Sequence, residues 1–159
     1  MLNNIGSRVI CLGENVASEW ILGKEVGDGE DSSRPDSAGA RSLLSRIGGG
    51  EIVMAGSRFG CGRRGREAAG VLKKAGVACL VARSFDRVFF RAAINQGLPA
   101  LEADIVGEVA DGSVIEIDFE HSRIIVPERV HVVAPFPQRL ADVISAGGLL
   151  AYVRESLSG

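Results

Sequence analysis

The chain has 159 residues, of which 46% are hydrophobic and 24% charged, and its formal net charge is −2. A chain of this length can bury a stable core without disulfides or metal, so we expect one domain over residues 1–159. The absence of a global positive charge and the few scattered aromatic residues argue against a nucleic-acid partner. No run approaches 18 apolar residues, so we expect no membrane contact and a cytoplasmic location.

The first third of the chain alternates short apolar pieces with turns. Apolar residues predict a strand at Arg8–Leu12, and a turn-rich passage follows with one apolar piece at Trp20–Leu22. Residues 27–39 contain almost no apolar side chain and are predicted to form an exposed mobile loop. This loop is either a solvated connector or a flap over a site. A short amphipathic helix is predicted at Ala40–Ile47.

The middle of the chain predicts a βαβ unit. Glu51–Ala55 is rich in β-branched residues and is predicted to be a strand. Arg66–Ala75 has apolar residues at helical spacing, with Gly76 as its stop. The continuous apolar run Val77–Ala82 is typical of a strand that is covered on both faces. Strand, helix and strand in this order predict a right-handed crossover.

A second helix is expected after this crossover. Ser84 is predicted to be its N-cap, and Gly97 and Pro99 are predicted to end it. Its apolar face is predicted to contain Phe85, Val88, Phe89 and Ala92.

A hairpin and two helices are expected to complete the chain. Residues 113–119 and 123–126 are predicted to pair as a β-hairpin through a turn that contains His121. Pro137 is predicted at the first position of another helix, with Leu140, Val143 and Ile144 turned inward, and residues 149–157 form a last short helix. One crossover mixed with a hairpin predicts an α/β domain with a mixed sheet.

A glycine-rich turn, Gly60-Cys61-Gly62-Arg63-Arg64-Gly65-Arg66, joins the strand of the predicted crossover to its helix. Free backbone N–H groups at a helix start favour an anion. The three arginines add donors that match a carboxylate or phosphate, unless they only solvate an exposed turn. The sequence therefore predicts an anion site that includes Gly62, Arg63, Arg64, Gly65 and Arg66.

The same turn matches the spacing G-x-G-x-x-G of dinucleotide-binding loops, but its context differs. Four residues separate the strand from Gly60, whereas the first glycine of that fingerprint follows its strand directly. The strand at Val77–Ala82 is followed by Arg83 rather than by an acid. A dinucleotide site is therefore disfavoured.

The cysteines and histidines do not predict a metal site in this chain. Cys11, Cys61 and Cys79 are widely spaced, and no CxxC or Cys/His pair occurs. Cys11 and Cys79 lie in apolar runs and are expected to be small buried hydrophobic residues. His121 and His131 are isolated, so neither is favoured as a ligand or base.

Two blocks of the sequence resemble a known family. Phe59-Gly60-Cys61-Gly62 and the block from Ser84 to Pro99 (SFDRVFFRAAINQGLP) are similar to the motifs FGCGSSREHA and SFxRIFFRNAINNGLP of isopropylmalate dehydratase small subunits. Asn15 and Ile21–Lys24 stand where that family has DNxDTDxIIPGR, and Ala146-Gly147-Gly148-Leu149 with Tyr152 resembles its AGGLxxYL. The resemblance spans nearly the whole chain.

The resemblance implies a swivelling β/β/α domain of the aconitase superfamily, like the aconitase C-terminal domain. It implies a partner, a large subunit that carries a [4Fe–4S] cluster, while this chain binds no cofactor itself. It also implies a lyase that acts on a small di- or tricarboxylate in leucine biosynthesis and is inactive without its partner. Lys24, at the family's arginine position, joins the substrate-binding residues on this ground.

The sequence departs from the family pattern at its active-site loop. The serine associated with proton abstraction falls at Arg63, the next serine at Arg64, and the substrate-binding arginine at Gly65. An insertion of one residue would instead match Arg66 to the family's arginine, but would not restore the serines. The catalytic base is therefore unassigned, since arginine is too basic to replace serine in this role. Two hypotheses stand: a hydro-lyase or isomerase subunit, or a divergent paralogue with a specialised or non-catalytic role.

Overall fold

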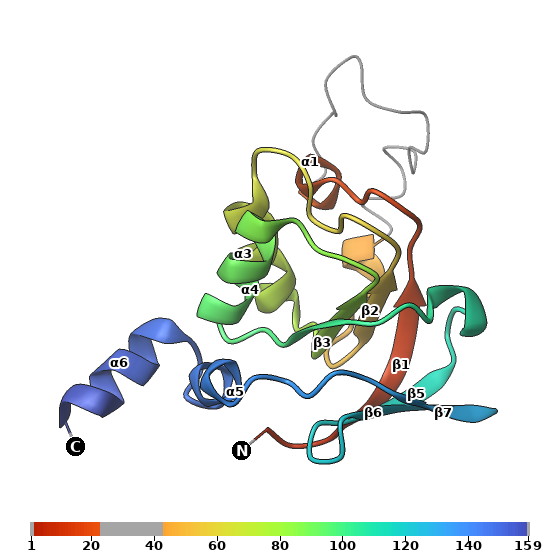
Figure 1. The fold of residues 1–159 in the computed structure, drawn as a ribbon. Helices are drawn as coiled ribbons and strands as arrows, with labels where there is room; N and C mark the ends of the chain where they lie inside the picture. Colours follow the sequence, from red (N-terminus) through yellow and green to blue (C-terminus); the bar gives the residue numbers. More distant parts are fainter. Residues whose placement is uncertain (1, 23–42, 159) are drawn as a thin grey trace.

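A computed structural model describes residues 2–22 and 43–158 (Figure 1). Lys24 and the predicted mobile loop at 27–39 lie outside the described residues, as does the start of the helix predicted at Ala40–Ile47. Residues 43–46 of that predicted helix are helical.

A seven-stranded mixed sheet forms the centre of the fold, as the sequence predicts. Its spatial order is β4-β3-β2-β1-β5-β6-β7. Strands β1 to β4 run parallel to one another, whereas β5, β6 and β7 are antiparallel. The strands are β1 (Ile5–Cys11), β2 (Ile52–Ala55), β3 (Cys79–Ala82), β4 (Ala100–Glu102), β5 (Val114–Asp118), β6 (Arg123–Val126) and β7 (Arg129–Val132).

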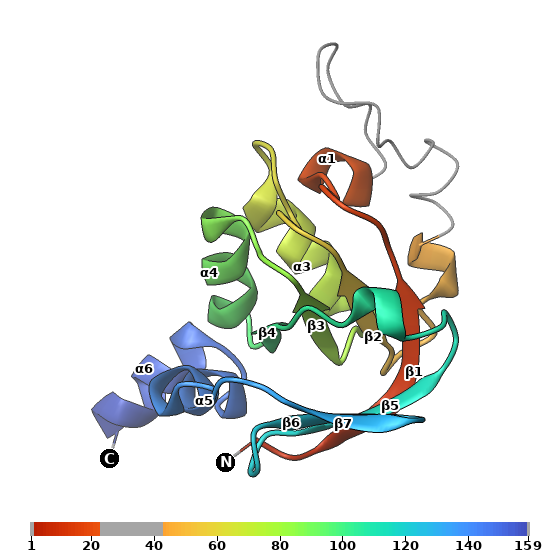
Figure 2. The same cartoon turned by 45° about the vertical axis from the view of Figure 1, so that its right-hand side comes forward.

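The parallel strands are buried on both faces because two separate hydrophobic clusters cover them. In β2, Val53 and Ala55 point into one cluster, and Ile52 and Met54 into the other. The first cluster includes the inner sides of the helices, and the second includes β5 and β6. Figure 2 shows how the sheet bends beyond β1, so that β5, β6 and β7 turn away from the parallel strands. This bend produces the predicted β/β/α arrangement.

The helices are α1 (Ser18–Ile21), α3 (Gly65–Ala75), α4 (Arg87–Asn95), α5 (Gln138–Ser145) and α6 (Leu149–Ser158), with a 3₁₀ turn at Val106–Glu108. The predicted crossover is confirmed, because α3 connects the parallel strands β2 and β3 and ends at Gly76 in the left-handed conformation (φ +95°). The predicted hairpin and the last helix are also confirmed as β5–β6 and α6.

The predicted start of α4 is wrong. Asp86, not Ser84, is the N-cap, and its carboxylate accepts hydrogen bonds from the backbone N–H groups of Val88 (3.0 Å) and Phe89 (3.2 Å). Ser84 Oγ instead accepts from the backbone N–H of Arg58 (2.9 Å). The shift moves Val88 off the inner face, and its side chain is 53% exposed. Ser84 therefore supports the preceding turn rather than the helix.

The structure also differs from the sequence prediction in three smaller features. Pro137 is the N-cap of α5 and not its first residue. Cys79 is fully buried as predicted, but Cys11 is only partly buried, and its Sγ donates to the carbonyl of Val109 (3.5 Å). The predicted strand that ends at Ala82 begins at Cys79, since Val77 still belongs to the turn after α3.

Strand β4 is absent from the sequence prediction because it is short and lies at an edge of the sheet, whereas β7 corresponds to a strand-like run around His131. Tertiary pairing creates both: β4 pairs with β3, and β7 with β6. Side chains on β7 are mostly exposed, so its apolar pattern does not mark a buried face.

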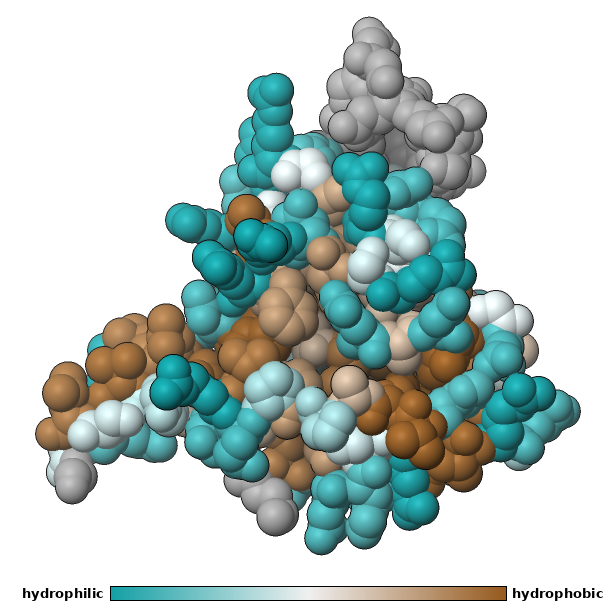
Figure 3. All heavy atoms as spheres, viewed as in Figure 1, coloured by the Kyte–Doolittle hydropathy of each residue, from teal (hydrophilic) through white to brown (hydrophobic). Residues whose placement is uncertain are grey.

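Hydrophobic and hydrophilic side chains are unevenly distributed over the surface. Hydrophobic side chains gather over α6, whereas hydrophilic ones cover the region around α1 and the start of α3 (Figure 3). The exposed aliphatic residues on α6 are Leu149, Leu150, Val153 and Leu157. Within the described ranges, no helix is long and apolar enough to span a membrane.

Candidate functional site

The arginine turn, which we define as residues 59–66, lies at the carboxyl ends of the parallel strands, the edge of an α/β sheet where ligands usually bind. Arg83, just after β3, cross-links this edge. Its Nη1 donates to Glu14 Oε1 (2.9 Å) after β1, and its Nε donates to Asp104 Oδ1 (2.9 Å) after β4. Glu14 also accepts from the backbone N–H of Ser57, just after β2. These ion pairs are partly exposed, so they align the loops more than they stabilise the fold.

Gly60 and Gly62 give the arginine turn a conformation that other residues rarely adopt, with φ of +81° and +105°. A Cβ atom on Gly60 would collide with the ring of Phe89, and one on Gly62 would collide with the carboxylate of Glu19. The turn is therefore packed closely between α4 on one side and α1 on the other.

The two sequence blocks that carry the family resemblance pack against each other. Phe59 N–H donates to the carbonyl of Ser84 (3.0 Å), and Asp86 N–H donates to the carbonyl of Phe59 (2.9 Å). The ring of Phe59 makes edge-on contacts with Phe89 (5.2 Å between centroids) and Phe85 (5.9 Å). The residues at the start of α4 thus hold the arginine turn in place through backbone hydrogen bonds and aromatic contacts.

The segment of residues 13–19 holds the arginine turn and its approach from the other side by backbone hydrogen bonds. Four N–H···O=C bonds connect the two segments: Gly56 to Gly13 (3.1 Å), Asn15 to Ser57 (2.9 Å), Gly60 to Val16 (2.8 Å) and Ser18 to Cys61 (2.7 Å). These four backbone hydrogen bonds on one side and the aromatic contacts on the other fix the backbone conformation of the turn.

Two donors that the sequence predicted to be free are occupied. The backbone N–H of Arg63 donates to Glu19 Oε1 (2.9 Å), and that of Arg64 donates to Ser18 Oγ (3.0 Å). Ser18 Oγ in turn donates to Glu19 Oε2 (3.1 Å). The prediction of free backbone donors is therefore wrong for these two residues, because α1 brings its own carboxylate to the turn.

The arginine side chains remain available. Those of Arg63 and Arg66 are exposed and pair with no acidic residue in the part of the chain that the structure describes. Arg64 Nη1 lies 3.1 Å from Glu67 Oε1, an exposed pair within the first turn of α3. Nine of the 18 lysines and arginines occur in residues 56–91, together with only two of the 20 acids. The segregation holds along the sequence, whereas at the edge itself Glu14, Glu19 and Asp104 offset part of the positive charge. The exposed guanidinium groups of Arg63 and Arg66 are therefore the groups that are suited to an anion.

Gly62, Arg63 and Arg64 lie in the turn before α3, whereas Gly65 and Arg66 are the first two residues of that helix. Their role in binding stays a prediction, and the sequence analysis missed the residues that support them. Ser18 and Glu19 were not identified as partners of the turn. Glu14 and Arg83 were not connected with the site. Each of these contacts joins segments that lie far apart in the sequence, so local spacing carried no signal for them.

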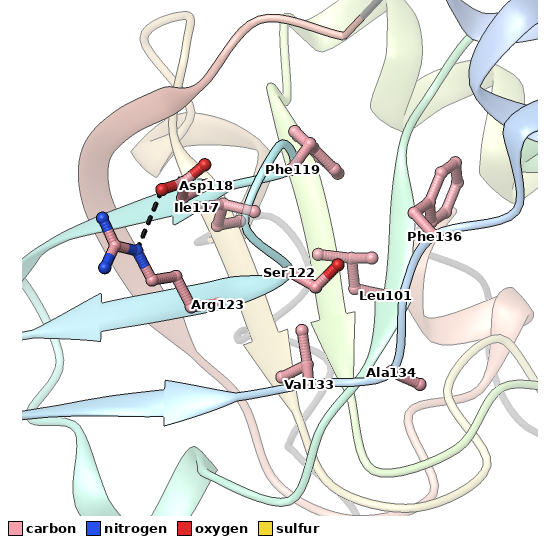
Figure 4. A pocket seen from close by; sticks show the side chains of 9 residues that line it. All are labelled: Leu101, Ile117, Asp118, Phe119, Ser122, Arg123, Val133, Ala134 and Phe136. Atoms are coloured by element: carbon pink, nitrogen blue, oxygen red, sulfur yellow. Dashed lines mark hydrogen bonds and ion pairs between the residues drawn. The ribbon is translucent and has the colours of Figure 1, made fainter.

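A second polar feature lies at the opposite end of the sheet, where β5 and β6 turn. Figure 4 shows a small, mostly apolar hollow between this hairpin and residues 133–136, with the carboxylate of Asp118 facing Arg123. Asp118 is buried (3% exposed) and accepts from the His121 backbone (3.1 Å), the His121 ring (2.9 Å) and Arg123 Nε (2.9 Å). Burial tends to raise the pKa of Asp118, but these hydrogen bonds lower it to about 2. All three of these hydrogen bonds to the Asp118 carboxylate come from His121 and Arg123 of the same hairpin, so the carboxylate holds the hairpin together.

Across residues 2–22 and 43–158, no three His, Cys, Asp or Glu side chains are grouped to hold a metal ion. Burial raises the pKa of the Cys79 thiol far above its ordinary value, which makes this thiol a poor ligand.

The fold defines a β/β/α domain with an arginine-rich turn at one edge of its sheet, and comparison with known proteins gives the family. The aconitase C-terminal domain model matches residues 3–104. The 3-isopropylmalate dehydratase small subunit of Halothermothrix orenii is 33% identical over 157 residues, which cover 92% of this chain and 93% of that protein. The small subunit from Aquifex aeolicus is 37% identical over 147 residues, which cover 91% and 83%.

A solved structure agrees with this assignment. The 3-isopropylmalate dehydratase structure from Methanocaldococcus jannaschii superposes with a TM-score of 0.81 and 26% identity, over 97% of this chain and 95% of that one. The chain belongs to the 3-isopropylmalate dehydratase small-subunit family of the aconitase superfamily.

Proposed function

We propose that this chain is the small subunit of a heteromeric hydro-lyase or isomerase of the 3-isopropylmalate dehydratase type, acting in the cytoplasm on a malate-type di- or tricarboxylate. The observation that carries the proposal is the arginine turn: a rigid backbone presents exposed guanidinium groups at the carboxyl edge of a family-typical fold. A guanidinium matches a carboxylate with two parallel hydrogen bonds. The turn is therefore the part of the chain that binds substrate.

Arg63 and Arg66 bind the carboxylates of the substrate in this proposal. Arg64 contributes charge while it remains paired with Glu67. Gly62 and Gly65 keep the backbone close to α1 and α4, since a Cβ at Gly62 would strike Glu19 and one at Gly65 would lie 3.1 Å from the backbone nitrogen of Phe89. Lys24 completes the set as a further cation.

The partner is a large subunit that holds a [4Fe–4S] cluster. When bound there, such a cluster supplies a Lewis acid for the substrate's hydroxyl and carboxylate. In this division of labour, the large subunit holds the cluster and this chain binds the carboxylates of the substrate. The proton-transferring group remains unassigned, because Arg63 occupies the family's serine position.

A second function is favoured by that same substitution. Removal of a general base typically costs a factor of about 10² to 10⁴ in rate. A chain with arginine in place of both serines is therefore also consistent with a divergent paralogue, either a component of a specialised pathway or a non-catalytic binding subunit.

Anaerobic co-purification with candidate large subunits tests the proposal, followed by cluster reconstitution and a screen of malate-type acids. We expect a stable complex that hydrates or dehydrates one of these acids, whereas neither subunit alone does so. A complex that binds the acids without turnover would select the paralogue. Failure to associate with any iron–sulfur subunit would contradict both the hydro-lyase and the subunit assignment.

A further inference from the structure

Glu19 is an acidic residue whose side chain contacts the arginine turn, the segment proposed to bind an anionic substrate. It lies on the four-residue helix α1, yet its Oε1 accepts from the backbone N–H of Arg63 at 2.9 Å, directly before α3 begins. Its Oε2 accepts from Ser18 Oγ, which itself accepts from Arg64 N–H. One carboxylate and one hydroxyl thus take the two N–H groups that lead into α3.

Sequence and packing show that this contact is built into the turn. Gly62 provides the space for the carboxylate, because a Cβ there would collide with Glu19 Oε2. Ser18 is completely buried, and its backbone N–H donates to the carbonyl of Cys61 (2.7 Å), which fixes α1 against the turn. The carboxylate also lies near the positive end of the α3 dipole, where a negative charge is favoured.

Glu19 is charged at neutral pH. Burial tends to raise its pKa, but the hydrogen bonds from the backbone N–H groups of Arg63 and of Glu19 itself, the hydrogen bond from the Ser18 side chain and the nearby charge of Arg64 together outweigh this effect. The pKa therefore lies below its ordinary value. A permanent negative charge at this place repels a second anion from the same N–H groups.

We propose that Glu19 is a positioning and specificity-determining residue, because its carboxylate fills the backbone anion site in front of α3 and leaves substrate binding to the guanidinium groups of Arg63 and Arg66. Small inorganic anions, which helix starts commonly bind, are thereby kept from competing at this position. The role of the guanidinium groups rests on the proposed function, whereas the filling of the backbone site does not.

The first test is a sulfate titration of the full-length chain followed by ¹⁵N–¹H NMR, with sodium chloride at matched ionic strength as reference. In Glu19→Ala, the amide of Arg63 should shift saturably, and sulfate should bind there at least about tenfold more tightly than in the wild type, since the freed N–H can form a hydrogen bond of typical strength to the charged sulfate. Glu19→Gln keeps an acceptor in place and should show no such gain.

Glu67→Ala is the matched control. It removes an equal charge near the start of α3 but leaves Glu19 on the Arg63 N–H, so the Arg63 amide should respond to sulfate as in the wild type. If Glu19→Ala does not fold, Glu19→Ser carries the same titration, because its short side chain cannot reach that N–H. Equal sulfate affinity at the Arg63 amide in the wild type and the Glu19 variant would overturn the proposal.

The second test uses the reconstituted complex. Sulfate should raise the KM of the Glu19→Ala complex for its acid substrate by a larger factor than it raises the wild-type KM at the same ionic strength, because the guanidinium groups are present in both complexes and the backbone site is open only in the variant. A purely structural role for Glu19 would lower activity without strengthening the competition by sulfate. If no acid substrate is found, the proposed function fails, while the NMR result still decides whether Glu19 fills the backbone site.

Discussion

Gly60→Ala tests whether the arginine turn is held against α4 as the structure describes. Gly60 has φ of +81°, and an added Cβ would collide with the ring of Phe89, which is fully buried. Left-handed backbone costs a residue with a side chain about 1–2 kcal/mol, and overpacking a core typically costs about 1–3 kcal/mol. The expected loss of unfolding free energy is therefore about 2–5 kcal/mol, which lowers Tm by roughly 4–20 °C in a chain of this length.

Gly112→Ala is the matched control for this prediction. Gly112 has φ of +86°, but no atom lies within 4 Å of the position of its Cβ. Its substitution should cost only the backbone term, about 1–2 kcal/mol. Urea unfolding of both variants, followed by circular dichroism, isolates the contact with Phe89 as the difference between them. Equal losses in the two variants would refute the close packing of the arginine turn on α4.

Three further predictions concern stability and reactivity. Asp118→Asn should abolish a stabilisation that is present above about pH 4 and is lost as pH falls toward 2, because His121 and Arg123 hold the folded pKa of Asp118 below its unfolded value; urea unfolding between pH 2 and 6 measures this. Asp86→Ala should lower the unfolding free energy by about 1 kcal/mol through loss of the α4 cap; unchanged stability would contradict the cap. Cys79 should react with a thiol reagent only after unfolding, because burial raises its pKa, and rapid labelling of the native chain would count against that burial.

Features that depend on neighbouring residues were predictable from the sequence. The α3 helix, its end at Gly76 and the alternation of β5 and β6 all follow from local spacing, so the βαβ unit and the hairpin were found. The start of α4 was less predictable, because Ser84 and Asp86 are both good caps. The structure separates them through the contact of Ser84 with Arg58, which lies 26 residues away in the chain.

The candidate site also has one part that was predictable from the local sequence and one part that was not. Its arginines form one continuous stretch of sequence, and the motifs on either side of them indicate the family. The occupied backbone donors were not predictable, because Glu19 lies 44 residues before Arg63. Nothing in the sequence around Glu19 indicates that its side chain reaches the start of α3. The sequence therefore predicts what the turn contains, whereas the fold decides which of its donors are available.

The most direct test of the central claim is the effect of losing the two exposed guanidinium groups on a reconstituted complex. Arg63→Met with Arg66→Met keeps much of the side-chain bulk while removing the charge, and Arg139→Met, an exposed arginine on α5, is the control. Hydrogen bonds to charged groups contribute about 1.5–3 kcal/mol each. We expect kcat/KM for the acid substrate to fall by at least about 10²-fold in the double variant and to be unchanged in the control. An unchanged kcat/KM in the double variant would contradict the assignment of this turn as the carboxylate-binding site.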